Sequence, residues 1–458
     1  MEGFLALVGK ISGWIWGIPM LIILVGGGIW MTFALGFFQF RYFPFIMKET
    51  FGKIFAKVEG EGTISPFQAA TSALASTIGA SNIVGVPVAI AFGGPGAIFW
   101  MWVTAILGSA LKFSEIILGI KYREKNPQGE YVGGPMYYLR KGLKSPLLAG
   151  IFAFCLMIEI VPSIATQTVS VVQTASTIGI SVWVTGAVVA IIVGLVVYGG
   201  IKRIAQVTEK LVPFMALLYF IGALIIILSN ISKLPMAIGL IFKHAFTPIA
   251  AAGGFTGAGI AATMRWGIAR GVYSNEAGMG TAPVAHCAAV TDHPARQAMW
   301  GIFEVIVDTL VVCTTTAIVV LVTGLWKTVP ASEAASIPAR AFQGLMGEAL
   351  GGTIVTISIL LFVLSTIIVI VYYGEKQAEY LFGTQFSRIM RFVYIIAIFL
   401  GAVGGLEFLY QFLDILLAAV IIPNVIGLLF MTKEIRQIKD EFFYDPKYYP
   451  GARIKNRK

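Results

Sequence analysis

Residues 62 to 111 form a continuous stretch without a charged side chain, and residues 11 to 40 form another. A helix that crosses a bilayer needs about 20 apolar residues, so the longer stretch holds two spans separated at the turn-forming segment Gly93–Gly96. A soluble domain carries about 25% charged residues. This chain of 458 residues has 12% charged and 57% hydrophobic residues, with a mean hydropathy of +0.85. We exclude soluble enzymes and disordered or disulfide-framed secreted chains, and predict a polytopic membrane protein.

Apolar runs long enough to cross a bilayer recur along the chain and predict eleven transmembrane helices. They fall near residues 14–38, 66–92, 96–120, 148–173, 182–200, 208–229, 247–270, 297–324, 353–374, 389–404 and 407–431. Lysine and arginine gather in cytoplasmic loops. With the N-terminus outside, 27 of the 33 basic residues fall inside, Arg265 and Arg270 among them, 5 fall outside, and Lys112 lies within a span. We therefore predict an all-α polytopic protein with its N-terminus outside and its C-terminus inside.

The chain divides into four predicted parts. Residues 1–40 form an N-terminal accessory transmembrane helix, 62–230 a first five-helix repeat, 245–432 a second five-helix repeat and 433–458 a basic cytoplasmic tail. The basic tail is expected to set topology beside lipid headgroups rather than to bind nucleic acid. The three cysteines and three histidines lack the spacing of a disulfide framework or a zinc site, so we expect no cofactor.

Two glycine-rich segments predict interrupted helices. Ser76–Pro87 places small and hydroxylated residues in the middle of the second span, and Ala251–Gly259 carries a run of glycines in the seventh. Unwound backbone exposes carbonyl oxygens to a cation, and the half-helix that follows offers its N-terminus to a carboxylate. Close helix packing through small residues is the competing explanation. Paired breaks in two halves indicate an inverted-repeat transporter whose breaks meet near the midplane.

Ionisable residues within the spans are few, and such residues have functional roles by default. Lys112 and Glu115 stand three residues apart and predict a structural ion pair. Asp308 either pairs with Arg265 or Arg270 or carries a proton. The remaining acidic residues within the spans are Glu159, Glu304 and Asp414. Ser365 and Thr366 in the ninth span offer two hydroxyl oxygens to a small cation, but such hydroxyls also bond to their own helix.

Several longer motifs resemble the signatures of the alanine or glycine:cation symporter family, which is placed in the amino acid-polyamine-organocation superfamily. They are Gly93–Gly108 (GGPGAIFWMWVTAILG), Gly133–Leu139 (GGPMYYL), Arg265–Gly271 (RWGIARG), Ser274–Pro283 (SNEAGMGTAP), Tyr372–Glu375 (YYGE) and Glu379–Gly383 (EYLFG). The resemblance covers nearly the whole chain. It implies a fold similar to that of the bacterial leucine transporter, with ten core helices in two inverted repeats after the accessory helix, and sodium-driven uptake of small neutral amino acids.

The resemblance also implies binding residues. The predicted substrate-binding residues, including one from the second glycine-rich segment, are Thr77, Gly79, Ser81, Asn82, Gln167, Gly257 and Ile370. The predicted sodium ligands are Ala75, Ile78, Phe362, Ser365 and Thr366. The chain departs from the family where Ser163 and Ile164 replace the usual Gly-Asn before Gln167, and where Ile370 replaces a tryptophan. The smaller residue at 370 predicts a roomier substrate pocket, and one methylene in such a pocket is worth about 1–3 kcal/mol of discrimination.

The sequence thus predicts a symporter without enzymatic activity. Its partners would be a neutral amino acid, sodium and the lipid bilayer, and the protein would act as a monomer in the cytoplasmic membrane of a prokaryote. A proton-coupled amino acid transporter using Asp308 or Glu159 is the alternative. A passive channel, or a membrane-embedded enzyme using Glu276, His286, Asp292 and His293, is a more distant one, since those four residues are predicted to lie on or near a cytoplasmic loop and lack metal-ligand spacing.

Overall fold

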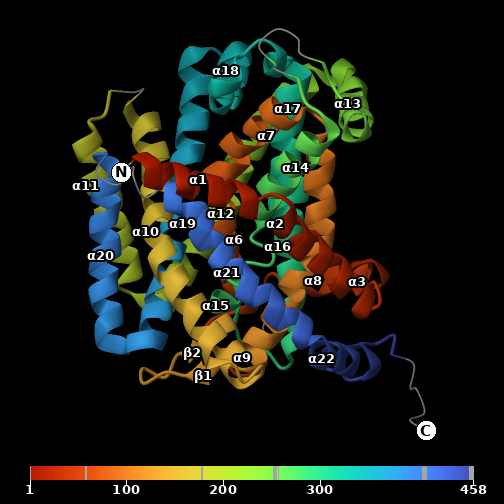
Figure 1. Cartoon of the computed structure of the whole chain (residues 1–458), viewed down its shortest axis with the longest axis vertical. Helices are drawn as coiled ribbons and strands as arrows, with labels where there is room; N and C mark the ends of the chain where they lie inside the picture. Colours follow the sequence, from red (N-terminus) through yellow and green to blue (C-terminus); the bar gives the residue numbers. More distant parts are fainter. Residues whose placement is uncertain are drawn as a thin grey trace.

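The computed structural model is a tall bundle of helices, most of which run along its long axis (Figure 1). It describes residues 2–56, 59–176, 179–250, 255, 257–404 and 410–452. Within these ranges, eight helices are long and apolar enough to cross a bilayer, and one further span is a helix pair bent by 50°. The prediction of a helical polytopic membrane protein is confirmed.

The α-helices have the following bounds: α1 (Glu2–Ile15), α2 (Ile18–Leu21), α3 (Gly27–Ala34), α4 (Phe38–Arg41), α5 (Phe43–Glu49), α6 (Pro66–Thr77), α7 (Val86–Gly93), α8 (Ala97–Lys121), α9 (Pro135–Lys141), α10 (Pro146–Ser176), α11 (Val182–Val197), α12 (Gly200–Ser229), α13 (Leu234–Phe246), α14 (Ile260–Asn275), α15 (Ala282–His286), α16 (Pro294–Val305), α17 (Thr314–Thr323), α18 (Ile337–Met346), α19 (Glu348–Phe382), α20 (Thr384–Ala402), α21 (Tyr410–Phe430) and α22 (Thr432–Tyr444). The π-helical segments are η1 (Ile22–Gly26), η3 (Ser81–Gly85) and η5 (Ile306–Cys313), and the short 3-10 helices are η2 (Phe51–Lys53), η4 (Ile231–Lys233), η6 (Leu325–Lys327) and η7 (Ala331–Ser336). Strands β1 (Glu124–Lys125) and β2 (Tyr131–Val132) form one antiparallel hairpin.

The first broken helix consists of α6, η3 and α7. It begins at a capping box in which Ser65 and Gln68 satisfy each other's backbone amides, with Pro66 at the first helical position. The helix ends at Ile78, whose ψ of 88° leaves the helical range, and resumes at η3. The interruption predicted within Ser76–Pro87 is therefore present.

The second break lies C-terminal to the glycine-rich segment that predicted it. Residues 251–254 and 256 of Ala251–Gly259 lie outside the described residues. Among the described residues, α14 ends at Asn275, and the backbone stays non-helical until α15 begins at Ala282. Glu276 takes a left-handed conformation with φ 54°, and Gly278 and Gly280 have φ 92° and 76°, values that glycine adopts without strain. The unwound segment is thus 276–281.

This shift changes the distribution of basic residues. Arg265 and Arg270 lie on α14, between the break and the end of the bundle that carries α13 and α18 (Figure 1). The sequence prediction ended the span at Arg270 and placed both arginines inside, because charged residues were taken to mark its cytoplasmic end. They belong instead to the end predicted to be outside, which leaves 25 basic residues inside and 7 outside. The excess of basic residues on the predicted inside is smaller than expected, but it still favours a cytoplasmic C-terminus.

The accessory segment and the C-terminal helix pack against each other and the bundle. Trp16 donates to the Asp414 carbonyl (2.8 Å) at the start of α21, and Trp30 donates to the hydroxyl of Thr432 (3.2 Å). Helix α22 buries Ile435, Ile438, Phe442 and Phe443. The first part of the predicted tail, up to Tyr444, therefore belongs to a helix that packs on the bundle.

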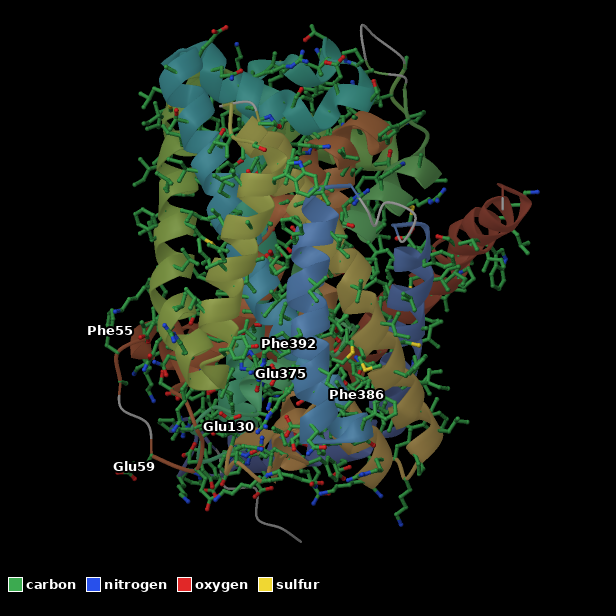
Figure 2. All side chains as sticks on the ribbon, turned by 90° about the vertical axis from the view of Figure 1, so that its left-hand side faces the viewer. Phe55, Glu59, Glu130, Glu375, Phe386 and Phe392 are labelled. Carbon is green, nitrogen blue, oxygen red and sulfur yellow. The ribbon has the colours of Figure 1, made fainter. Side chains whose placement is uncertain are left out.

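Large apolar side chains cover much of the outer surface. Phe392 on α20 is 56% exposed and lies on the face of the bundle shown in Figure 2, with Glu375 and then Glu130 below it. Trp183 on α11 and Leu217 on α12 are likewise exposed. A water-soluble protein rarely exposes such a continuous apolar surface, whereas a lipid-facing one requires it.

Candidate functional site

A small cavity lies where the two helix breaks meet. Its volume is about 50 Å³. The residues that line it are Ser76, Thr77, Ser81, Leu156, Glu159, Ile160, Ser163, Gln167, Tyr273, Glu276, Met279, Thr281, Thr366, Ile370, Tyr373 and Leu417. They come from α6, η3, α10, α14, the 276–281 segment, α19 and α21. A buried, mixed polar and apolar cavity between broken helices is the usual position of a transporter binding site.

Oxygen atoms from α6 and α19 converge beside the first break. The Thr366 hydroxyl lies 3.0 Å from the Ala75 carbonyl oxygen and 3.0 Å from the Phe362 carbonyl oxygen. The Ser365 hydroxyl donates to the same Phe362 carbonyl at 2.8 Å. All four residues are buried. Hydroxyl and carbonyl oxygens are the hard ligands that small metal cations prefer, so the donor set fits a sodium ion.

Ile78 belongs to the same neighbourhood by its position at the break. Its backbone leaves the helix at ψ 88°, so its carbonyl no longer follows the direction of the carbonyls in α6. The side chain is fully buried. The five residues predicted as sodium ligands are thus gathered at or next to the contact between α6 and α19.

Position 79 has little room for a side chain because the Thr366 hydroxyl of α19 lies close to it. A Cβ there would lie 2.9 Å from the Thr366 hydroxyl oxygen and 3.6 Å from the Gln167 side-chain nitrogen. Gln167 lines the cavity, and its side-chain oxygen is buried without a hydrogen-bond partner in the described structure. A buried acceptor without a donor costs about 1–3 kcal/mol. Gln167 is therefore placed to receive a donor from a ligand.

The other predicted substrate residues divide into two groups. Thr77, Ser81 and Ile370 line the cavity. Asn82 does not line the cavity. Its side-chain oxygen accepts from the Gly79 amide (3.0 Å), and its nitrogen donates to a carboxylate oxygen of Asp308 (2.6 Å).

Asn82 therefore connects the break to η5 and does not face the cavity. Gly257 is also away from the cavity lining, next to Ala258, which pairs with Ile249.

Two acidic residues in the cavity wall were not among the predicted binding residues. Glu159 on α10 was considered only as a proton carrier, and Glu276 was assigned to a cytoplasmic loop because the second break was misplaced. The Glu276 carboxylate accepts from the hydroxyls of Thr281 (2.5 Å) and Ser76 (3.4 Å). The glycines that follow Glu276 in the SNEAGMGTAP motif were the available signal for a turn at this position.

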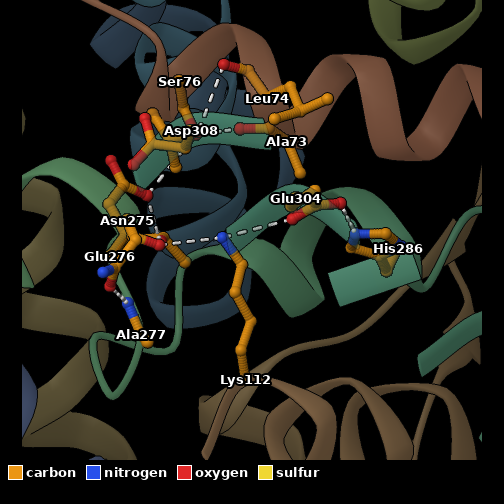
Figure 3. A network of polar contacts seen from close by, with 12 residues as sticks. Ala73, Leu74, Ser76, Lys112, Asn275, Glu276, Ala277, His286, Glu304 and Asp308 are labelled. Carbon is orange, nitrogen blue, oxygen red and sulfur yellow. Dashed lines mark hydrogen bonds and ion pairs between the residues drawn. The ribbon is translucent and has the colours of Figure 1, made fainter. Parts of the chain in front are cut away.

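A network of buried charged and polar groups lies behind the second break (Figure 3). The Lys112 ammonium group contacts a Glu304 carboxylate oxygen (3.1 Å) and the Asn275 carbonyl (2.9 Å). The His286 ring lies 2.5 Å from the other Glu304 oxygen, and Gln297 joins that ring (2.9 Å) to the Pro66 carbonyl (3.2 Å). The network therefore connects the C-terminus of α14 to the start of α6.

One prediction about these charges is wrong, and the arginine pairing considered as one alternative for Asp308 does not form. Lys112 pairs with Glu304 rather than Glu115, whose carboxylate accepts from Asn424 (2.6 Å) and the Gly280 amide (3.1 Å). Asp308 contacts neither Arg265 nor Arg270. It accepts from Asn82, Ser274 and Thr309, the last two at 2.7 Å each. A spacing of three residues identifies neighbours on one helix face, but here a partner on another helix is closer.

Comparison with solved structures supports the fold. The structure of MhsT in complex with L-phenylalanine superimposes with a TM-score of 0.56, at 11% identity, over 81% of this chain and 89% of that chain. At this identity the likeness shows the fold alone, and it agrees with the leucine-transporter-like fold predicted from the motifs. Fold and cavity together define a polytopic helical membrane protein with a binding site between broken helices.

Sequence comparison then defines the family. The chain is 50% identical over 451 residues to the uncharacterized transporter YflA of Bacillus subtilis. The aligned region covers 98% of this chain and 96% of the relative. It is 43% identical over 438 residues to the sodium/alanine symporter AgcS of Methanococcus maripaludis, covering 94% of this chain and 95% of the relative. The sodium:alanine symporter family model matches residues 1–450, and the chain belongs to this family. The predicted class, a membrane transporter for amino acids, is confirmed.

Proposed function

We propose that this protein couples inward sodium movement to the uptake of a small neutral amino acid by alternating access around the two helix breaks. The observation that carries the proposal is the convergence of Thr366, Ala75 and Phe362 oxygens beside the cavity. A sodium ion there would hold α6 to α19 and so connect ion occupancy to the shape of the cavity. The relative named as a sodium/alanine symporter supports the choice of ion and substrate.

The substrate carboxylate is proposed to meet the start of η3. Ser81 lines the cavity at this position, and the first amides of a helix lack partners within the helix and carry its positive dipole end. Thr77 and Gly79 complete this side of the site, and Gln167 faces it from α10. Asn82 acts indirectly, by holding the Gly79 amide.

The substrate side chain is proposed to point toward Ile370. This residue lines the cavity and is 7% exposed. The cavity volume of about 50 Å³ suits a small side chain, since one water molecule needs about 10–15 Å³ by the same kind of measure. Alanine, glycine or a somewhat larger neutral amino acid is the proposed substrate.

Eleven spans complete the proposed topology. They are the eight long helices, the bent pair, the short apolar helix α11, and a broken span made of α14, the 276–281 segment and α15. The proposed orientation has the N-terminus outside and the C-terminus inside, in the cytoplasmic membrane of a prokaryote, and the protein is proposed to act as a monomer without a cofactor or enzymatic activity. One charge moving across 100 mV supplies about 2.3 kcal/mol, enough for an approximately 50-fold substrate gradient.

The test is uptake into sealed liposomes that contain the purified protein. Labelled alanine, glycine and larger neutral amino acids would be offered with an inward sodium gradient, and again with choline in place of sodium. Accumulation only with sodium is expected. Equal accumulation with choline would contradict sodium coupling.

Proton coupling is the second candidate, because Glu159 lines the cavity as a carboxyl group able to carry a proton. Uptake that is independent of sodium and abolished by a protonophore would establish it.

A further inference from the structure

The cavity wall holds two carboxylate groups and, among the described residues, no lysine, arginine or histidine. We infer that Glu159 and Glu276 bind the α-ammonium group of the substrate, with the side-chain oxygen of Gln167 as a third acceptor. This inference rests on the proposed function and adds to it the residues that recognise the amino group. It predicts that the transporter rejects α-hydroxy acids of the same size.

Each carboxylate is oriented through one oxygen and leaves the other without a partner. The Oε2 atom of Glu276 accepts from Thr281 and Ser76, and no hydrogen bond from the described residues reaches its Oε1 atom. The Oε1 atom of Glu159 accepts from the Ser163 hydroxyl one helical turn away, and its Oε2 atom likewise receives no donor.

The Lys112 ammonium group balances these two carboxylates only in part. It attracts Glu276 across the wall, but its own hydrogen-bond and ion-pair partners are Glu304 and the carbonyl of Asn275 (Figure 3). Asp308 adds a further buried carboxylate behind the wall, and its donors are Asn82, Ser274 and Thr309. The cavity therefore faces an excess of acidic groups, and the Glu159 and Glu276 carboxylates lie close enough to repel each other.

An ammonium group satisfies this arrangement. Isolated charges inside a membrane protein are costly, and a bound cation with donors removes most of that cost. An ammonium group has three N–H donors and no acceptor. The unpartnered oxygens of Glu159, Glu276 and Gln167 provide three acceptors at one cavity.

The two ends of the cavity have opposite character. On one side, Ser81 at the start of η3 lines the cavity, where the helix formed by η3 and α7 has the positive end of its dipole. The α10 side and the 276–281 segment present the two carboxylates. A zwitterionic amino acid matches both ends, whereas an α-hydroxy acid supplies the carboxylate alone and leaves both glutamates without a cation. Sites built to pair with a polar substrate group reject analogues that lack it by up to about 10⁴–10⁵-fold.

The first experiment needs no substitution. Sodium-driven uptake of labelled L-alanine into liposomes would be measured in the presence of unlabelled L-alanine or unlabelled L-lactate. We expect lactate to require at least a 100-fold higher concentration than alanine for half-inhibition. Half-inhibition by lactate within tenfold of that by alanine would overturn the inference. If sodium drives no uptake of any neutral amino acid, the proposed function fails first, and the inference fails with it.

The second experiment uses Glu159→Gln and Glu276→Gln, which keep the side-chain shape and remove the charge. Each is expected to raise the KM for alanine at least tenfold. Stabilisation of the purified protein by sodium alone, measured as a rise in melting temperature, should persist, because the sodium ligands are untouched.

Glu115→Gln is the matched control. Glu115 is an equally buried carboxyl group, but it contacts Asn424 and Gly280 and lies outside the cavity. Its KM is expected to stay within twofold of the wild type. Wild-type KM values in both cavity variants would overturn the inference. If a variant does not fold, the competition between alanine and lactate on the unaltered protein still decides the question.

Discussion

The Thr366 hydroxyl lies 3.0 Å from the Ala75 carbonyl oxygen, although the two residues are 291 positions apart in the sequence. This contact joins α19 to the last turn of α6 before the break, and the same hydroxyl reaches the Phe362 carbonyl of its own helix. A cation placed among these oxygens would replace the hydroxyl proton as the partner of both carbonyls. Binding of the ion would therefore act directly on the junction between the two helices.

Thr366→Val tests the sodium site. The change keeps the shape of the side chain and removes the oxygen that contacts α6. We expect the sodium concentration for half-maximal uptake to rise about tenfold or more, which corresponds to about 1.4 kcal/mol. Ser365→Ala should raise it less, because the Ser365 hydroxyl contacts only Phe362 of its own helix and the sulfur of Met215. Unchanged sodium dependence in both variants would show that these α19 hydroxyls do not bind the ion.

Gly79→Ala tests the close approach at the first break. The added Cβ would lie 2.9 Å from the Thr366 hydroxyl oxygen, so this hydroxyl would have to leave its present position beside the Ala75 carbonyl. We expect uptake to fall below a tenth of the wild-type rate, with the protein still folded. Gly85→Ala is the control, because its Cβ would meet only Ser81 at 3.6 Å and Arg270 at 3.9 Å. Normal uptake by Gly79→Ala would show that the break is looser than the structure indicates.

Lys112 and Glu304 form a fully buried ion pair, so the two residues should depend on each other. Lys112→Met leaves Glu304 without its cation, and breaking such a pair costs about 3–5 kcal/mol. The double variant Lys112→Met/Glu304→Gln should lose less stability than Lys112→Met alone, because no uncompensated charge remains. Thermal unfolding of both proteins in detergent gives the comparison. A double variant less stable than Lys112→Met would mean that the pair does not act as a unit.

The partner of Lys112 also shows where sequence reasoning reached its limit. Spacing along one helix pointed to Glu115, but the partner is on α16, and a contact between helices depends on packing that no local pattern encodes. The first break was predictable because glycine and hydroxylated residues interrupt an apolar run. The nearness of Thr366 to Ala75 could not be predicted from the residues themselves and came only from the resemblance to a family.

The second break was misplaced for a related reason. Arg265 and Arg270 were taken to end a span, whereas both lie on α14 before the unwound segment, in the part of the bundle that carries α13. Charged residues mark the end of a span only when they face the lipid or the membrane surface. Arg270 instead lies over the rings of Trp266 and Tyr273. The error moved Glu276 out of the membrane and hid its place in the cavity wall.

Ile370→Trp tests the proposed position of the substrate side chain. Ile370 lines the cavity, and the larger indole ring of tryptophan would take up space beside the substrate. We expect preference to shift toward glycine over alanine by about 10-fold or more, in line with about 1–3 kcal/mol per methylene. The ratio of kcat/KM for the two substrates measures this. An unchanged ratio would place the substrate side chain elsewhere.

His293 provides a test of how the end of the bundle that carries α22 is held together. Its ring nitrogen accepts from the Ala295 amide (3.1 Å) and so caps α16, and the ring packs against Phe442 of α22 and against Tyr448. Burial lowers the pKa of His293 below its usual 6.5, outweighing the carboxylates of Glu441, Asp292 and Asp445, and Arg296 lowers it further. The cap requires the neutral ring.

Because the folded-state pKa lies below the unfolded-state value, the contribution of this cap is fully present above about pH 6.5. It is lost as the pH falls through the folded-state pKa, where the ring gains a proton and can no longer accept from the amide. We expect the melting temperature of the wild type in detergent to fall between pH 7.5 and pH 5, and that of His293→Asn to fall less. Asparagine caps a helix without titrating, so the difference between the two proteins isolates His293 from the other groups that titrate in this range. Parallel pH profiles of the two proteins would show that protonation of the His293 ring does not affect the stability of the protein.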